Sequence, residues 1–157
     1  MGDLLVPLYS LDTASTNDPD SGFRIQRPLA ADKHRVVAWV KEHFSERWAS
    51  ETEIAFSDLP PRCFIALDSE NQLVGFACYD AAFKGFFGPT GVAPEFRGHG
   101  LGTRLLIRSL EAMREAGYAY AIIGGSGADE YYEKTVGAIP IPDSTPGPYR
   151  EWIKPEE

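Results

Sequence analysis

Three glycines, Gly98, Gly100 and Gly102, come directly before the longest helical pattern in the chain. A helix over about residues 100–116 is predicted because its apolar residues share one face: Leu101, Leu105, Leu106, Leu110 and Met113. Backbone N–H groups at a helix start have no partner within the helix and attract anions. Glycines also let a phosphate approach the backbone closely. The turn therefore predicts a phosphate site, with a turn that serves packing alone as the alternative.

The spacing of these glycines excludes two common phosphate carriers. In the dinucleotide pattern G-x-G-x-x-G, the third glycine would fall on Thr103 or on Leu105. The P-loop needs a lysine, and this segment contains none.

Alternating and helical apolar patterns describe one mixed α/β domain over residues 23–157, after an N-terminal extension and linker over residues 1–22. The segment Leu4–Leu8 is expected to add an edge strand or to pack against a partner chain. Gly and Pro interrupt the strand at 85–92, which predicts a bulge or the close approach of another molecule. Strands are predicted at 23–27, 63–67, 73–79, 85–92, 118–123 and 149–153, and helices at 31–44, 48–56, 100–116 and 129–136.

Charge and composition limit the classes of partner that we expect for this protein. Fifteen Lys and Arg against 23 Asp and Glu give a net charge of −8, so we expect no nucleic-acid partner. No apolar run approaches the roughly 18 residues of a membrane span, and no signal peptide is evident, so we expect a cytoplasmic protein without a membrane partner. Cys63 and Cys78 lie in apolar runs without zinc-ligand spacing. They are expected to be buried hydrophobic residues, and no metal is expected.

The glycine turn at residues 97–102 also resembles a known sequence motif. Arg97-x-x-Gly100-x-Gly102 matches the [Q/R]-x-x-G-x-[G/A] coenzyme A motif of the GNAT (Gcn5-related) N-acetyltransferases. The passage from Thr90 to Arg97, the run Glu130–Lys134 and the order of elements from Phe23 onward are similar to that family. The resemblance implies a single mixed, mostly antiparallel twisted sheet flanked by helices. It also implies transfer of an acetyl group from acetyl-CoA to a primary amine of a small molecule or peptide, and a possible homodimer.

The resemblance assigns roles to particular residues. Tyr132 takes the place of the acid that protonates the departing thiolate, and a phenol with a pKa of about 10 holds its proton at neutral pH. Packing is the alternative role for Tyr132. The acetyl-CoA-binding residues implied are Thr90, Gly91, Val92, Arg97, Gly98, His99, Gly100, Leu101, Gly102 and Thr103.

The chain also departs from the family pattern. Many members carry an asparagine seven residues before the tyrosine, where this chain has Gly125 and where Ser126 or the backbone must substitute. This departure and the lack of an evident general base keep a second hypothesis open, a non-catalytic acyl-CoA-binding sensor or interaction module. The general base is not evident, and the candidates by chemistry alone are Asp80, Glu42, Glu53 and His43. Aromatic residues fall in acceptor-lining segments, although core packing is the simpler account for most of them: Trp39, Phe44, Trp48, Phe83, Phe86 and Phe87.

Overall fold

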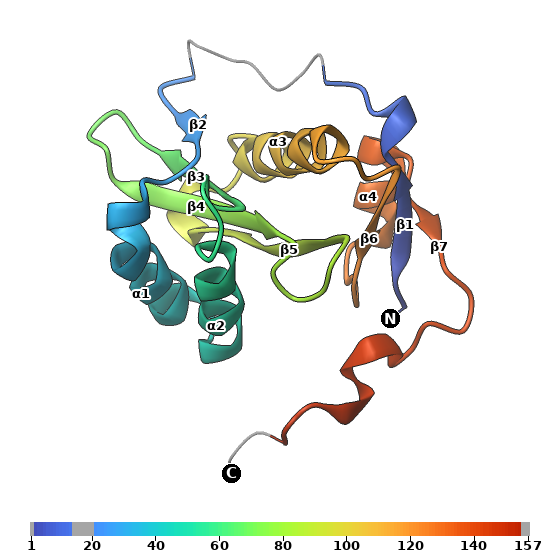
Figure 1. The fold of residues 1–157 in the computed structure, drawn as a ribbon. Helices are drawn as coiled ribbons and strands as arrows, with labels where there is room; N and C mark the ends of the chain where they lie inside the picture. The colour runs from blue at the N-terminus through green and yellow to red at the C-terminus, as the bar shows by residue number, and fades with distance from the viewer. Residues whose placement is uncertain (1, 14–20, 155–157) are drawn as a thin grey trace.

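The computed structural model describes residues 2–13 and 21–154, and within them one seven-stranded sheet forms the centre of the molecule (Figure 1). The strand order is β2-β3-β4-β5-β6-β1-β7. The strands are β1 (Leu4–Pro7), β2 (Arg24–Gln26), β3 (Cys63–Leu67), β4 (Leu73–Tyr79), β5 (Phe86–Val92), β6 (Tyr120–Ile123) and β7 (Ile139–Pro140). The α-helices are α1 (Lys33–His43), α2 (Glu46–Ala55), α3 (Leu101–Glu115) and α4 (Asp129–Val136).

The pairing of the strands confirms the mixed, mostly antiparallel sheet. Each neighbouring pair is antiparallel except β5 and β6, which run parallel. The register between β4 and β5 shifts between Ala77 and Tyr79, opposite Gly88 and Pro89. The bulge therefore lies at the point that the Gly- and Pro-containing sequence predicts.

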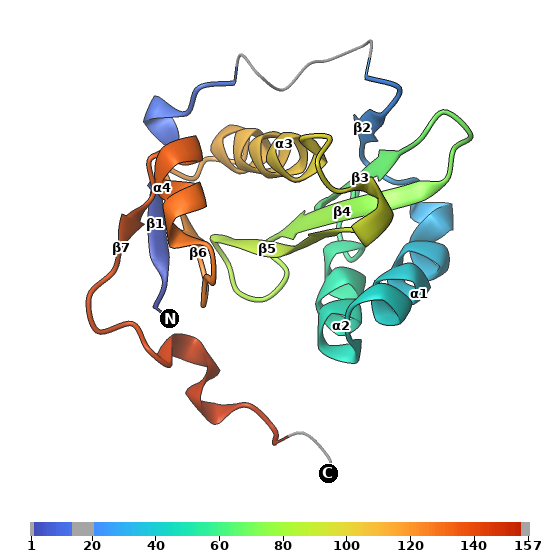
Figure 2. The same cartoon turned by 180° about the vertical axis from the view of Figure 1, so that it is seen from behind.

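Helices cover both faces of the sheet, as the two opposite views show (Figures 1 and 2). Alternate residues of β3 supply both cores: Cys63 and Ile65 pack with α1 and α2, whereas Phe64 and Ala66 pack with α3. Helix α3 contributes most to its core because its apolar face is fully buried, through Leu101, Leu105, Leu106, Leu110 and Met113. The four α-helices match the helices predicted from the sequence to within two residues at every end.

The N-terminal segment is an inner part of the sheet. Strand β1 pairs with β6 on one side and with β7 on the other, so it does not form the sheet edge. Leu4 and Val6 point into the main core and are almost fully buried. The extension predicted over residues 1–22 thus includes a strand, and residues 14–20 of the predicted linker lie outside the described residues.

The predicted strand at 149–153 is wrong. The chain forms a 3-10 helix there, η4 (Gly147–Glu151), and the edge strand is the earlier β7. Pro146 and Pro148 lack the N–H groups that a strand ladder needs, and Gly147 has φ +63°. The strand predicted at 118–123 is β6, which is buried at Ala121 and Ile123 but half exposed at Tyr120.

The two cysteines are buried, as predicted. Cys63 and Cys78 face each other across β3 and β4. A hydrogen bond with Cys78 and burial raise the pKa of Cys63 well above its usual value, so its thiol stays protonated. Within residues 2–13 and 21–154, no three His, Cys, Asp or Glu side chains cluster as metal ligands. None of the helices described there is long and apolar enough to cross a membrane.

Candidate functional site

Strands β5 and β6 separate after a short parallel contact. They pair only at Phe86 with Ile122 and at Phe87 with Ile123. From there β5 continues to Val92 beside β4, and no other described strand pairs with its far edge, which faces the gap. A groove of about 650 Å³ occupies this gap and reaches the start of α3. An extended ligand could therefore lie along β5 as an additional strand would.

The glycine turn forms one end of the groove. Gly98 and Gly100 adopt left-handed conformations, with φ of +89° and +74°, which glycine reaches at little cost. A Cβ atom at Gly98, Gly100 or Gly102 would meet no atom within 4 Å, so the space over the turn is open. Arg97 lies beside the turn, and its Nε donates to the Val92 carbonyl over 3.2 Å.

The backbone amides of this turn are unpaired within the described part of the chain. From Gly98 to Thr103, six consecutive N–H groups donate no hydrogen bond to any described residue; the first amide to do so is Arg104, to the Gly100 carbonyl over 3.2 Å. Because these donors lie at the start of a 15-residue helix, the helix dipole reinforces their attraction for anions. The turn has the features of a phosphate-binding cradle.

The structure brings nearly all of the predicted site residues together. Nine of the ten predicted acetyl-CoA-binding residues line the groove, and so does Tyr132; the nine are Thr90, Gly91, Val92, Arg97, Gly98, Gly100, Leu101, Gly102 and Thr103. His99 does not line it: its exposed ring lies beside Phe23, with centroids 5.3 Å apart. Thr90 contributes mainly backbone, because its hydroxyl donates to the Phe76 carbonyl over 3.1 Å.

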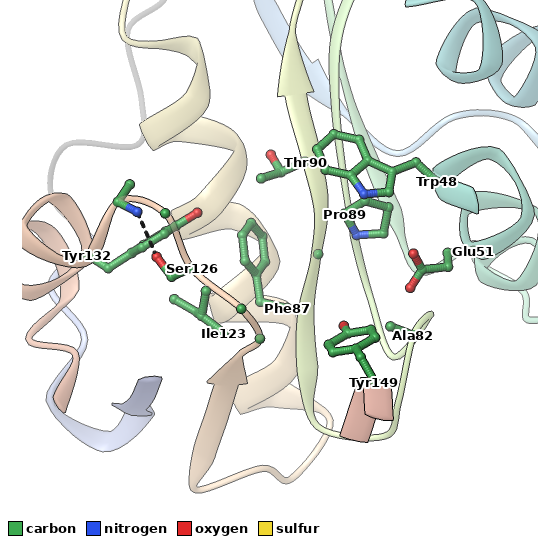
Figure 3. Close-up of a pocket in the computed structure, with 15 residues that line it drawn as sticks. Trp48, Glu51, Ala82, Phe87, Pro89, Thr90, Ile123, Ser126, Tyr132 and Tyr149 are labelled. Carbon is green, nitrogen blue, oxygen red and sulfur yellow. Dashed lines mark hydrogen bonds between the residues drawn. The ribbon is translucent and has the colours of Figure 1, made fainter. Parts of the chain in front are cut away.

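Tyr132 occupies the middle of the site. It lines the groove and also a second cavity of about 330 Å³ beside it. Figure 3 shows its ring extending from α4 with the hydroxyl directed into the cavity, toward Phe87 and Thr90. Burial, followed by the neighbouring Tyr131, raises the pKa of Tyr132 to about 12. The hydroxyl makes no hydrogen bond to the described residues, so its proton is available to a ligand.

The neighbours of Tyr132 hold α4 against the turn. The Tyr131 hydroxyl and Thr103 Oγ1 are 2.6 Å apart, which links α4 to the first turn of α3. Ser126 is buried, and its Oγ accepts from the Ala128 N–H over 3.0 Å, the bond drawn in Figure 3. Ser126 therefore orders the chain before α4, in the region where the family asparagine is missing.

The sequence did not single out several residues of the second cavity. Its lining includes the loop 124–128. It also includes Glu51 from α2 and Tyr149 from the C-terminal segment, residues 141–154. The one signal for Glu51 is its position three residues after Trp48, which places both on one face of a helix. The four base candidates named by chemistry, Asp80, Glu42, Glu53 and His43, line neither cavity. Of the six aromatic candidates, Phe44, Trp48 and Phe87 line the groove.

Gly91 is a position where the groove tolerates no side chain. A Cβ there would overlap the Phe44 ring and would lie 2.7 Å from its Cε1. The ring cannot yield easily, because it packs against Trp48 and Phe76 with centroids 5.2 and 5.7 Å away. We expect Gly91→Ala to lower the free energy of unfolding by about 1–3 kcal/mol. Thermal unfolding should then shift down by roughly 3–10 °C for a domain of this size.

Gly102→Ala is the matched control for Gly91→Ala. Gly102 is helical and has open space at its Cβ position, so alanine should leave stability unchanged or raise it slightly. Equal melting temperatures for Gly91→Ala and the unchanged protein would show that Phe44 does not pack on the strand as described.

Comparisons with known proteins agree with this architecture. The family model described as "Acetyltransferase (GNAT) family" matches residues 33–138. No curated protein matches the chain. A GCN5-related N-acetyltransferase from Sphaerobacter thermophilus is similar in fold, with TM-score 0.69 and 22% identity over 89% of this chain and 48% of that one.

Two further solved structures show the same fold. The glucosamine N-acetyltransferase region of a fungal multi-domain GH3 β-N-acetylglucosaminidase has TM-score 0.68 and 14% identity, covering 89% of this chain and 19% of that one. A GNAT family acetyltransferase from Brucella melitensis, in complex with acetyl-CoA, has TM-score 0.54 and 20% identity, covering 71% of this chain and 80% of that one. The chain spans half or less of the first two proteins.

The matched region runs from α1 to just beyond α4. It therefore includes the separating strands β5 and β6, the glycine turn and Tyr132. It also spans more than half of the 157 residues. The chain belongs to the GNAT acetyltransferase family.

Proposed function

We propose that this protein is an acetyl-CoA-dependent N-acetyltransferase that acts on a primary amine of a small molecule or peptide. The observation that carries the proposal is the continuity of the site. One groove runs from the unpaired amides of the glycine turn to Tyr132, where it meets the second cavity. The groove suits an anionic carrier with an extended arm, and the second cavity suits the acceptor.

The residues of the groove fit acetyl-CoA. The amides of Gly98 to Thr103 would hold the pyrophosphate, because they donate to none of the described residues and no Cβ fills the space above the glycines. The edge of β5 from Thr90 to Val92, which pairs with no other described strand beyond Phe87, offers backbone groups to the amides of the pantetheine arm, although the Val92 carbonyl already accepts from Arg97.

In the proposed reaction, the chain polarises the thioester carbonyl and donates a proton to the departing sulfur. When bound, acetyl-CoA supplies an acetyl thioester, whose carbonyl carbon the amine nitrogen attacks. A backbone N–H on the free edge of β5 would stabilise the charge that develops on the carbonyl oxygen. Tyr132 holds its proton through neutral and moderately alkaline pH and would give it to the sulfur as the C–S bond breaks. The nitrogen releases a proton to solvent as the N–C bond forms, and a proton from solvent restores the Tyr132 phenol, so that amine and thioester become amide and thiol.

Two measurements test this proposal. Calorimetric titration of the protein with acetyl-CoA should give saturable one-site binding. A panel of primary amines should then give acceptor-dependent release of free thiol. Binding without thiol release on any amine would favour the acyl-CoA sensor instead, and no binding at high acetyl-CoA concentration would contradict both functions.

A further inference from the structure

The second cavity is built for a particular chemical class of ligand. It adjoins the acetyl-CoA groove, with which it shares Trp48, Phe87, Thr90, Ala128 and Tyr132. A ligand held there would therefore reach the same point as an acyl group held in the groove. The identity of that ligand rests on the proposed function, because the ligand would be the acceptor of that reaction.

Among the described residues that line this cavity, Glu51 alone has a side chain that carries a formal charge at neutral pH. It is half buried, and it forms no hydrogen bond or ion pair with the residues that the structure describes. Burial raises the pKa of Glu51, an effect that the positive charge of Arg47 opposes. A partly desolvated carboxylate without a hydrogen bond is costly, and a cationic ligand would relieve that cost.

Aromatic side chains flank this carboxylate. Trp48 lies one turn before Glu51 on α2, and Tyr149 comes from η4 (Gly147–Glu151). Figure 3 shows Trp48, Glu51 and Tyr149 along one side of the cavity. Indole and phenol rings attract ammonium groups through their electron-rich faces. This wall therefore offers both a negative charge and aromatic faces to a cation.

The C-terminal segment is anchored at both ends so that Tyr149 reaches the cavity. At one end the Asp3 N–H donates to Ser144 Oγ over 2.7 Å, and the Ile141 N–H donates to the Asp3 carbonyl over 2.9 Å. At the other end the Arg47 guanidinium lies 4.4 Å from the centre of the Trp152 ring. The segment thus extends from β1 to α2, and Tyr149 contacts Phe83 between these points, with centroids 5.6 Å apart.

We propose that the acceptor is a small amine bearing a second cationic group, which Glu51 binds between Trp48 and Tyr149. Figure 3 places Glu51 and Tyr149 on the side of the cavity opposite Tyr132 and Ser126. Glu51 accordingly holds the cationic group that does not react, while the reacting amino group lies toward Tyr132 and Thr90. An acceptor with a carboxylate at its far end would be repelled by Glu51.

Three acceptors of equal chain length test this assignment: 1,4-diaminobutane, butylamine and 4-aminobutanoate. Their far ends are positive, uncharged and negative. We expect kcat/KM to be highest for 1,4-diaminobutane. Glu51→Gln keeps the size of the side chain and should lower that value about 10- to 100-fold, the range for a hydrogen bond to a charged group. For butylamine the change should stay within about twofold.

Glu46→Gln is the matched control. Glu46 lies on the same helix, with 81% of its side chain exposed in a surface pair with Lys41, and it lines neither cavity. This variant should keep the preference for 1,4-diaminobutane. An equal loss of activity on all three acceptors in Glu51→Gln would overturn the assignment, because it would indicate removal of a proton from the reacting amine. Equal use of butylamine and 1,4-diaminobutane by the unchanged protein would also overturn it.

A binding measurement separates the cation site from the proposed function. Calorimetric titration with 1,4-diaminobutane should show binding to the unchanged protein and to Glu46→Gln, with an affinity about 10- to 100-fold lower in Glu51→Gln. If that pattern appeared without any acetyl transfer, the cation site would stand and the transferase function would fall. Acetylation of 1,4-diaminobutane that is insensitive to Glu51→Gln would support the function and refute the site.

Discussion

Tyr132→Phe is expected to lower kcat about 100-fold, at the lower end of the range for removal of a general acid. The phenyl ring fills the same space at the junction of the groove and the second cavity, but it carries no proton to donate. The hydroxyl makes no hydrogen bond to the described residues, so its removal breaks no contact that supports the fold. The dissociation constant for acetyl-CoA, measured by calorimetry, should therefore change by less than about twofold.

The pH dependence of kcat provides an independent check on Tyr132. Burial raises its pKa from the usual 10 to about 12, so the neutral, proton-donating form predominates at every pH below that value. Activity should rise with pH as the acceptor ammonium loses its proton, and Tyr132 should cause no decline below about pH 11. The measurement is a kcat profile from pH 6 to 11 at saturating substrates.

Tyr131→Phe is the control for the Tyr132 experiments. Its hydroxyl contacts Thr103 on α3, so its loss should alter acetyl-CoA affinity more than kcat. If Tyr132→Phe turned over at the original rate, or if both variants lost the same amount of kcat, Tyr132 would not be the acid.

Gly100→Glu should weaken acetyl-CoA binding by at least about 100-fold, or 2.8 kcal/mol at 1.4 kcal/mol per tenfold step. Glutamate places a negative charge beside the amides from Gly98 to Thr103, which donate to no residue that the structure describes and where the proposed pyrophosphate would lie. Its backbone also has to adopt φ +74°, which costs about 1–2 kcal/mol of stability in a residue other than glycine. Calorimetric titration measures the affinity, and thermal unfolding measures the strain.

Gly100→Ala separates these two effects. Alanine shares the backbone strain of glutamate but adds no charge, and its Cβ would meet no atom within 4 Å. Gly100→Ala should lose most of the stability that Gly100→Glu loses. It should keep much more of the affinity for acetyl-CoA. Unchanged binding of acetyl-CoA to Gly100→Glu would place the pyrophosphate elsewhere and would remove the basis for the groove assignment.

The local features of the fold were predictable from the sequence because local forces decide them. Helix α3 follows from the spacing of its leucines, and its end follows from Gly117, whose N–H bonds to the Arg114 carbonyl over 3.0 Å. The bulge in β5, between the pairs Ala77–Thr90 and Tyr79–Phe87, follows from Gly88 and Pro89. Prediction failed at residues 149–153, where a short run containing Tyr149 and Trp152 lies beside prolines that cannot join a ladder.

The candidate site was predictable only in part. The turn and Tyr132 lie within sequence motifs, so their residues could be named and their proximity expected from the resemblance alone. Glu51, Tyr149 and Asp3 belong to no motif, and their positions are 48 residues or more apart along the chain.

The sequence by itself determined the glycine turn before α3, the apolar faces of the helices and the family, because each depends on residues that are neighbours in the chain. The tertiary structure decided what the second cavity contains. Strand β1 enters the sheet between β6 and β7, and its Asp3 backbone holds the C-terminal segment at Ile141 and Ser144. That segment then carries Tyr149 toward Glu51 on α2. Contacts between such distant segments arise from packing and strand pairing, which no local pattern encodes.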